Sequence, residues 1–230
     1  MKKILILLLF TSICFAQRHN PEDILEKVKE NFSKVKDYEV NVKIKVDVNF
    51  LKVPDSQAKI YYKQPDNIKL KSEGFALLPK EGLNFSPYSF LEGDYTSILD
   101  KELEVEGNPC YLVKVIPLGE RGDLILTTLW IDKDKYIIRR IESTTKTNGT
   151  FSIDLKYDNN LKYPLPSSMV FTFNVQKMQM PKELTGDMAE QSDEEKGNIE
   201  KTTTGKVYIN YSDYKVNMGL SDSIFKEHKK

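Results

Sequence analysis

The segment Tyr38–Phe50, YEVNVKIKVDVNF, decides the fold predicted for this chain. Apolar residues occupy every second position in it, and polar or charged residues occupy the positions between them. This period of two is typical of an antiparallel strand with one apolar face and one wet face. At about 3.3 Å per residue the strand is roughly 40 Å long. Its apolar face must be covered by helices, by another sheet or by something that is not protein.

The N-terminal residues 1–16 are predicted to be a secretory signal peptide that is cleaved before Gln17. Two lysines precede the apolar run Ile4–Phe10, and the run is followed by a suitable cleavage site at Ala16. The run is too short to span a bilayer. A lipid anchor on Cys14 is the less favoured alternative, because Ile13 stands where bacterial lipoproteins have Gly, Ala or Ser.

The rest of the chain, residues 17–230, is expected to form one exported domain. The full sequence has 34 basic and 34 acidic side chains, so it has no net charge that would attract nucleic acid or an anionic membrane. Cys110 is the only cysteine after cleavage, so no internal disulfide is expected and core burial has to stabilise the fold.

One helix and a series of strands are predicted around the central segment. Asn20 and Pro21 begin a helix that runs to about Lys36, with an apolar face that packs on a sheet. Alternation and turn signals place the remaining strands. These strands cover Ala58–Pro65, Ile68–Lys71, Cys110–Ile116, Leu124–Ile131, Tyr136–Glu142, Phe151–Tyr157, Met169–Val175 and Val207–Tyr211. The fold class is therefore α+β with an antiparallel sheet.

Two segments do not follow the strand pattern. Gly74–Leu99 combines glycines and prolines with many bulky apolar residues, which indicates either a cover over the sheet or the lining of a pocket. Lys177–Lys201 carries Met178, Met180 and Met188 and then a charged run, and it is interpreted as an excursion between two strands.

The residues that most catalytic sites require are missing or badly placed. The two histidines, His19 and His228, lie near the termini, so a histidine-dependent nucleophile or a transition-metal site is not expected. Cys110 begins a strand and is interpreted as a small buried residue. No paired carboxylates and no phosphate-binding glycine pattern stand out. We therefore expect a protein without enzymatic activity, metal or cofactor.

The order of four short motifs resembles the periplasmic lipoprotein carrier LolA and its relatives LolB and LppX. The motifs are YYKQPDNIK at Tyr61–Lys69, EGNPCYLVKVIP at Glu106–Pro117, LWID at Leu129–Asp132 and YSDYKVN at Tyr211–Asn217. The resemblance covers most of residues 17–230. In the carrier family an arginine commonly precedes the proline of the first motif and helps to latch the lid, whereas this chain has Gln64 there.

The resemblance implies a strongly curved antiparallel sheet, an incomplete barrel, with helices that cover its concave face. The concave face would bind acyl chains of a lipoprotein or a lipid during transport to the outer membrane. The predicted wall residues are Val40, Val42, Ile44, Val46, Ile60, Tyr62, Ile68, Leu70, Phe151, Ile153, Phe171 and Phe173, and the three methionines would belong to a lid or a partner-binding loop. Handover proteins of the inner and outer membranes would be partners, and a monomer is expected.

Two alternatives remain open. The chain could be an envelope sensor or binding module of the same fold that acts through protein contacts. The apolar face could also be an ordinary packed core, because the twelve tyrosines and eleven phenylalanines of the chain are equally compatible with side-chain packing.

Overall fold

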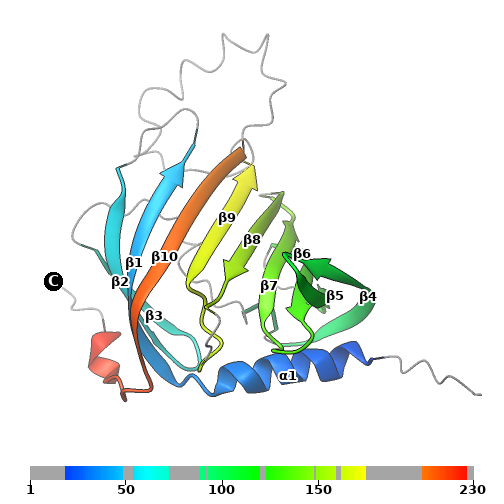
Figure 1. Ribbon diagram of the computed structural model, residues 1–230, viewed down its shortest axis with the longest axis horizontal. Helices are drawn as coiled ribbons and strands as arrows, with labels where there is room; N and C mark the ends of the chain where they lie inside the picture. The colour runs from blue at the N-terminus through cyan, green and yellow to red at the C-terminus, as the bar shows by residue number, and fades with distance from the viewer. Residues whose placement is uncertain are drawn as a thin grey trace, which may run out of the picture.

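The computed structural model describes residues 19–48, 54–72, 89–91, 93–119, 123–147, 149–158, 162–174 and 204–226. They form an antiparallel sheet of ten strands in the order β3-β2-β1-β10-β9-β8-β7-β6-β5-β4 (Figure 1). The strands are β1 (Asp37–Asp47), β2 (Ser56–Lys63), β3 (Asn67–Ser72), β4 (Tyr95–Val105), β5 (Asn108–Pro117), β6 (Leu124–Asp132), β7 (Ile138–Thr145), β8 (Thr150–Lys156), β9 (Ser168–Asn174) and β10 (Thr204–Val216).

The sheet is open, with β3 and β4 as its two edge strands. It is also curved, and β4, β5 and β6 curl over at the side of the molecule away from β2 and β3 (Figure 1). The predicted antiparallel sheet is therefore confirmed. The predicted cover of several helices is not, because the described residues contain one α-helix, α1 (Pro21–Ser33), and two short 3-10 helices, η1 (Ser89–Leu91) and η3 (Asp222–Ile224).

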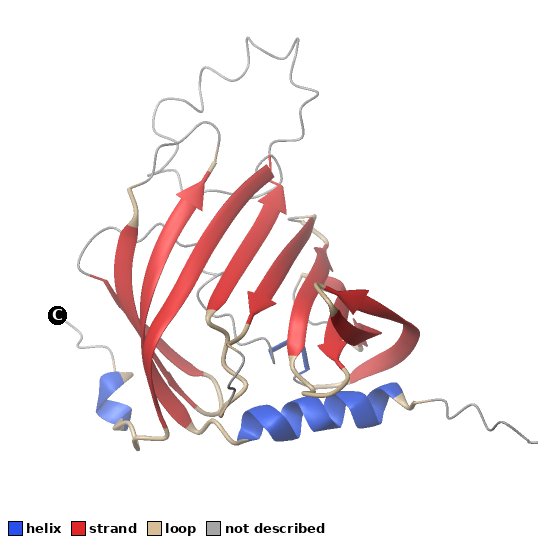
Figure 2. Cartoon of the chain, in the orientation of Figure 1, coloured by secondary structure: helices blue, strands red, loops and turns tan. Residues whose placement is uncertain are grey.

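Helix α1 begins as the sequence indicates and lies along one end of the strands (Figure 2). The Asn20 side chain accepts a hydrogen bond from the Glu22 backbone N–H, and Pro21 fills the first helical position. Ile24, Leu25 and Val28 are buried against the sheet. The helix ends at Ser33 rather than at Lys36, and Val35 is buried in the connection to β1.

The central strand β1 pairs with β2 on one side and with β10 on the other. The first strand, β1, and the last strand, β10, are therefore neighbours within the sheet. The junction is held by Asp37, whose carboxylate accepts hydrogen bonds from the backbone N–H groups of Met218 and Gly219. Asn217 adds a side-chain hydrogen bond to the Lys34 carbonyl. These contacts fix the C-terminal end of β10 beside the α1–β1 connection.

The sequence analysis placed no strand between Lys71 and Cys110, whereas β4 begins at Tyr95 and includes the end of the segment Gly74–Leu99. Tyr95 and Leu99 pack on the core, but a register shift between Leu99 and Lys101 interrupts the alternation. The neighbouring Ile98 is exposed on this edge strand. Residues 1–18, 73–88 and 175–203 lie outside the described residues, and so do Met178, Met180 and Met188.

The core is one hydrophobic cluster on a single face of the sheet. Buried residues of α1 and Leu91 belong to the same cluster. We call this the inner face, defined by Val40, Val42 and Ile44 of β1, and the opposite face the outer face. In the described part of the chain no helix is both long and apolar enough to cross a membrane.

Candidate functional site

The inner face of β1 carries the predicted wall residues in alternation with exposed polar residues. Val40, Val42 and Ile44 are each at most 2% exposed, and Val46 is partly buried. Asn41, Lys43 and Lys45 point the other way and are exposed. The alternation in the sequence therefore identified the correct face of this strand.

The other predicted wall residues come from β2, β3, β8 and β9, and the structure brings them onto the same face. The core cluster contains all of them except Tyr62, which is buried and stacks on Tyr38 with ring centroids 5.1 Å apart. The members from these strands are Ile60, Ile68, Leu70, Phe151, Ile153, Phe171 and Phe173. Ile68 and Leu70 on the edge strand β3 are only partly buried.

The end of the inner face nearest α1 is built from tyrosines. Tyr38 contacts Tyr62 on one side and the edge of Tyr214 on the other, at 5.6 Å between centroids, and Tyr214 stacks on Tyr211. Phe32 of α1 lies 5.7 Å from the Tyr62 ring. The sequence pattern indicated Tyr62 but not this cluster, because the partners come from distant segments.

The hydroxyls of this tyrosine end are largely used by the chain itself. Tyr62 donates to the Pro65 carbonyl at 3.2 Å, Tyr214 to the Pro166 carbonyl at 2.9 Å and Tyr157 to the Ile138 carbonyl at 2.8 Å. Burial raises the pKa of Tyr38, Tyr157, Tyr211 and Tyr214 above the ordinary value. All four phenols are therefore neutral at physiological pH.

The opposite end of the inner face is built from phenylalanines. Phe171 stacks on Phe173 at 5.3 Å and contacts Phe151 at 5.4 Å. The Phe173 ring lies over Gly205, its partner on β10, so closely that a Cβ at Gly205 would lie 2.6 Å from the ring. Glycine is thus required at this position for the ring to cover the strand.

The inner face continues onto β5, β6 and β7, where the sequence analysis had not chosen a face. The buried residues of this continuation are Tyr111, Val113, Val115, Leu129, Ile131, Ile138 and Ile141. Their strands are buried on both faces at several positions, so alternation alone was no guide. The sequence signal from which the register could have been counted is the pair Glu106–Gly107. These two residues form the turn of the β4–β5 hairpin, and both have positive φ.

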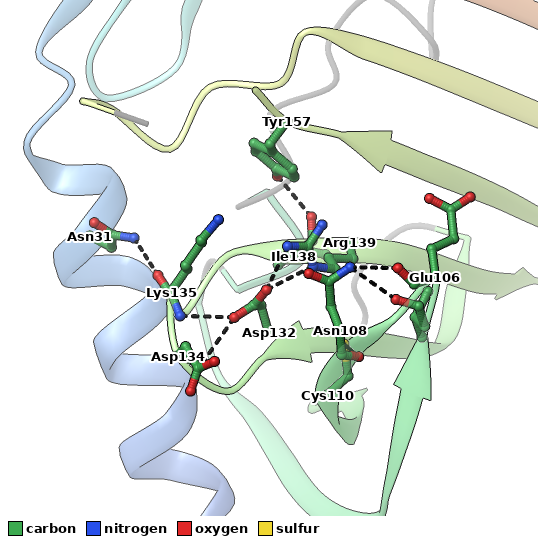
Figure 3. A network of polar contacts seen from close by, with 11 residues as sticks. Asn31, Glu106, Asn108, Cys110, Asp132, Asp134, Lys135, Ile138, Arg139 and Tyr157 are labelled. Carbon is green, nitrogen blue, oxygen red and sulfur yellow. Dashed lines mark hydrogen bonds and ion pairs between the residues drawn. The ribbon is translucent and has the colours of Figure 1, made fainter. Parts of the chain in front are cut away.

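A buried ion pair holds the β6–β7 hairpin and joins it to α1 (Figure 3). The Asp132 carboxylate accepts hydrogen bonds from the backbone N–H groups of Asp134 and Lys135, and Arg139 donates to it at 2.8 Å. Asn31 of α1 donates to the Lys135 carbonyl at 2.9 Å. This network anchors α1, and the Asp132 and Arg139 side chains are only 3% and 12% exposed, so we assign it a structural role.

Cys110 lies beside this network, opposite Asp132 in the β5–β6 register. It is fully buried and free, as the sequence analysis predicted. Burial, with a smaller contribution from the Asp132 charge, raises the pKa of its thiol to about 11. The thiol is therefore protonated at neutral pH and a poor nucleophile.

Gln64 takes part in a contact with α1. Its side-chain amide donates to the Ser33 carbonyl at the helix end, at 3.2 Å, and its backbone N–H donates to the Lys36 carbonyl. Gln64 thus satisfies one of the terminal carbonyls of α1.

The structure also has a hollow of about 540 Å³ near the ends of β1, β2 and β10. Its lining is mainly polar and includes Lys43, Lys45, Asp47, Gln57 and Asn210, which alternate with the inner-face residues. It suits a polar ligand better than an acyl chain. No group of three metal-ligating side chains comes together in the described parts of the chain.

Comparison with known proteins identifies the fold. The sequence matches no family model and no curated protein. The structure is similar to a LolA superfamily protein from Nitrosomonas europaea, with a TM-score of 0.58 and 14% identity over 91% of this chain and 98% of that one. It is also similar to an outer membrane lipoprotein-sorting protein domain from Vibrio parahaemolyticus, with a TM-score of 0.58 and 13% identity over 90% of this chain and 97% of that one.

A DUF1329 family protein from Desulfovibrio piger has a TM-score of 0.56 and 15% identity, over 90% of this chain and 95% of that one. The fold is therefore LolA-like, as the order of the sequence motifs predicted. At this level of identity the likeness establishes the fold and leaves the ligand to be argued from the inner face itself.

Proposed function

We propose that this protein is a non-enzymatic carrier that binds acyl chains of lipoproteins or lipids on the inner face of its sheet. The observation that carries the proposal is the extent of that face, which gathers aliphatic and aromatic residues from all ten strands into one cluster. The likeness of the fold to a lipoprotein-sorting domain supports it. Acyl chains are apolar and can pack against such a face.

The carrier is proposed to act in the periplasm after cleavage of residues 1–16, with membrane handover proteins as partners. The outer face supports transport through an aqueous compartment, because the exposed side chains of β1 are polar or charged. N-terminal sequencing of the exported protein should begin at Gln17. A mature chain that keeps residues 1–16 or carries lipid on Cys14 would refute this part of the proposal.

The first test is native mass spectrometry of the exported protein purified without detergent, followed by lipid extraction. A copurifying acyl lipid is expected. The second test locates the ligand with a fatty acid that carries a photoreactive group at its end. We expect crosslinks to inner-face residues such as Val42 and Phe171, and not to Lys43 or Lys45 on the outer face of the same sheet. No copurifying lipid, or crosslinks on the outer face, would overturn the proposal.

A second candidate function is a sensor or binding module of the same fold that acts through protein contacts. It is favoured by the packing at both ends of the inner face, where aromatic side chains fill space against one another. The photoreactive fatty acid separates the two, because a module filled by its own side chains will not be labelled on that face.

A further inference from the structure

Three hydroxyl side chains lie in one row across the inner face. Ser97 of β4 is opposite Val115 of β5, Val115 is opposite Thr127 of β6, and Thr127 is opposite Ser143 of β7. Residues directly opposite each other in a sheet project to the same face. Val115 belongs to the core cluster, so all three hydroxyls point toward the inner face.

These hydroxyls are buried and only partly satisfied. Thr127 and Ser143 are 0% exposed, and their oxygens are 2.9 Å apart, so one donates to the other. The Ser97 Oγ is buried and has no hydrogen-bond partner among the residues that the structure describes. Each hydroxyl has one hydrogen to donate. One hydrogen bond thus uses one of the three O–H groups, and the other two have no acceptor among the described residues.

The hydroxyl row, Ser97, Thr127 and Ser143, lies away from the tyrosine end. Strand β6 ends at Asp132, next to the hairpin that contacts α1, and Thr127 precedes that end of the strand. The next residue along the row is Phe151 of the phenylalanine end, opposite Ser143. The hydroxyls of Tyr62, Tyr157 and Tyr214 are already bound to backbone carbonyls, whereas the Ser97 hydroxyl is not.

A buried donor without an acceptor is unfavourable, and a ligand that brings an acceptor removes the cost. An acyl chain linked as an ester or an amide carries such an acceptor, its carbonyl oxygen, at the head of an otherwise apolar chain. We infer that one unpaired O–H of the hydroxyl row, from Ser97 or from the Thr127–Ser143 pair, binds the carbonyl oxygen of an acyl ester or amide and that the hydrocarbon runs along the inner face toward the tyrosine end. This inference rests on the proposed function and specifies how the ligand is oriented.

The test compares two probes that differ only at the carbonyl, palmitoyl lysophosphatidylcholine and its hexadecyl ether counterpart. Binding is measured by isothermal titration below the micelle concentration of both. One neutral hydrogen bond corresponds to about a three- to tenfold difference in Kd. Wild-type protein should bind the ester more tightly by that factor.

Two variants remove the proposed donors. Ser97→Ala loses a hydroxyl that has no partner in the fold, so the variant should fold normally. The double variant Thr127→Val with Ser143→Ala removes both hydroxyls of the hydrogen-bonded pair, so neither is left without its partner. The variant that removes the donor should abolish the ester preference and leave the Kd of the ether unchanged. Thr96→Val, an exposed hydroxyl of β4 that faces the other way, is the matched control and should keep the full preference.

The outcomes separate the two proposals. Equal affinity of wild-type protein for ester and ether overturns the inference and leaves the carrier function standing, as does a preference that survives in both variants. If neither probe binds, the proposed function fails and the inference fails with it.

Discussion

Gly205 provides a sharp test of how the phenylalanine end of the inner face is packed. Its Cα faces the Phe173 ring, and an added Cβ would lie 2.6 Å from Cζ, 2.8 Å from Cε2 and 2.9 Å from Val48 Cγ1. All three neighbours are side-chain atoms of buried residues. Gly205→Ala therefore forces the ring and the valine to move together in a region that is already filled.

The expected cost follows from these distances. An ordinary carbon contact is about 3.5–4.0 Å, so the ring has to shift by roughly 1 Å. Overpacking of this size in a core typically costs about 1–3 kcal/mol. The better strand propensity of alanine offsets part of the cost, about 0.5–1 kcal/mol. We expect Gly205→Ala to lower the free energy of unfolding by about 1–2 kcal/mol.

Urea denaturation followed by tyrosine and tryptophan fluorescence measures this change. The variant Phe173→Leu removes the ring atoms that clash, so Gly205→Ala should cost much less in the Phe173→Leu background. A coupling of at least about 0.5 kcal/mol between the two sites is expected, because contacting residues are not additive. A loss below about 0.5 kcal/mol in wild-type protein, or strict additivity, would refute this account of the contact.

Three further predictions concern buried polar groups. Asp132→Ala leaves Arg139 buried without its carboxylate and should reduce the free energy of unfolding by about 3–5 kcal/mol in urea, and a loss below about 1 kcal/mol would contradict the assignment. Because burial raises the pKa of Cys110 to about 11, its reaction with a thiol reagent in native protein at pH 8 should be far slower than in urea. Tyr38 and Tyr211 have folded pKa values above the ordinary one, so their contribution to stability is complete below about pH 10 and is lost as the pH rises further; absorbance titration should show these phenols ionising only with unfolding.

The sequence predicted β1 and β9 well because each of these strands has one buried face and one more exposed face. In β1 and β9 the buried residues alternate with the others, so periodicity alone found Val40, Val42, Phe171 and Phe173. The N-cap Asn20 was an equally local signal. Local patterns of this kind are independent of how the sheet curls.

The strands at the curled side were harder to predict because both of their faces are buried in places. Cys110, Tyr111, Leu112 and Val113 follow one another in β5 and are all buried. Leu112 faces outward, opposite Trp130, and Arg140 covers the Trp130 ring at 5.3 Å from its centroid. An apolar residue in this region therefore does not identify the inner face, and the register had to come from the structure.

The same difficulty hid the hydroxyl row, since a rule that places polar residues outward assigns Thr127 and Ser143 to the wrong face. Their positions also separate what folding requires from what it does not. The hydroxyls of Tyr62, Tyr157 and Tyr214 make hydrogen bonds within the fold, so packing and hydrogen bonding explain that end completely. Ser97 makes none, and an unpaired buried hydroxyl costs about 1–3 kcal/mol. Alanine at this position is therefore expected to stabilise the protein without ligand, and this cost of the Ser97 hydroxyl is the one that the proposed carbonyl acceptor would remove.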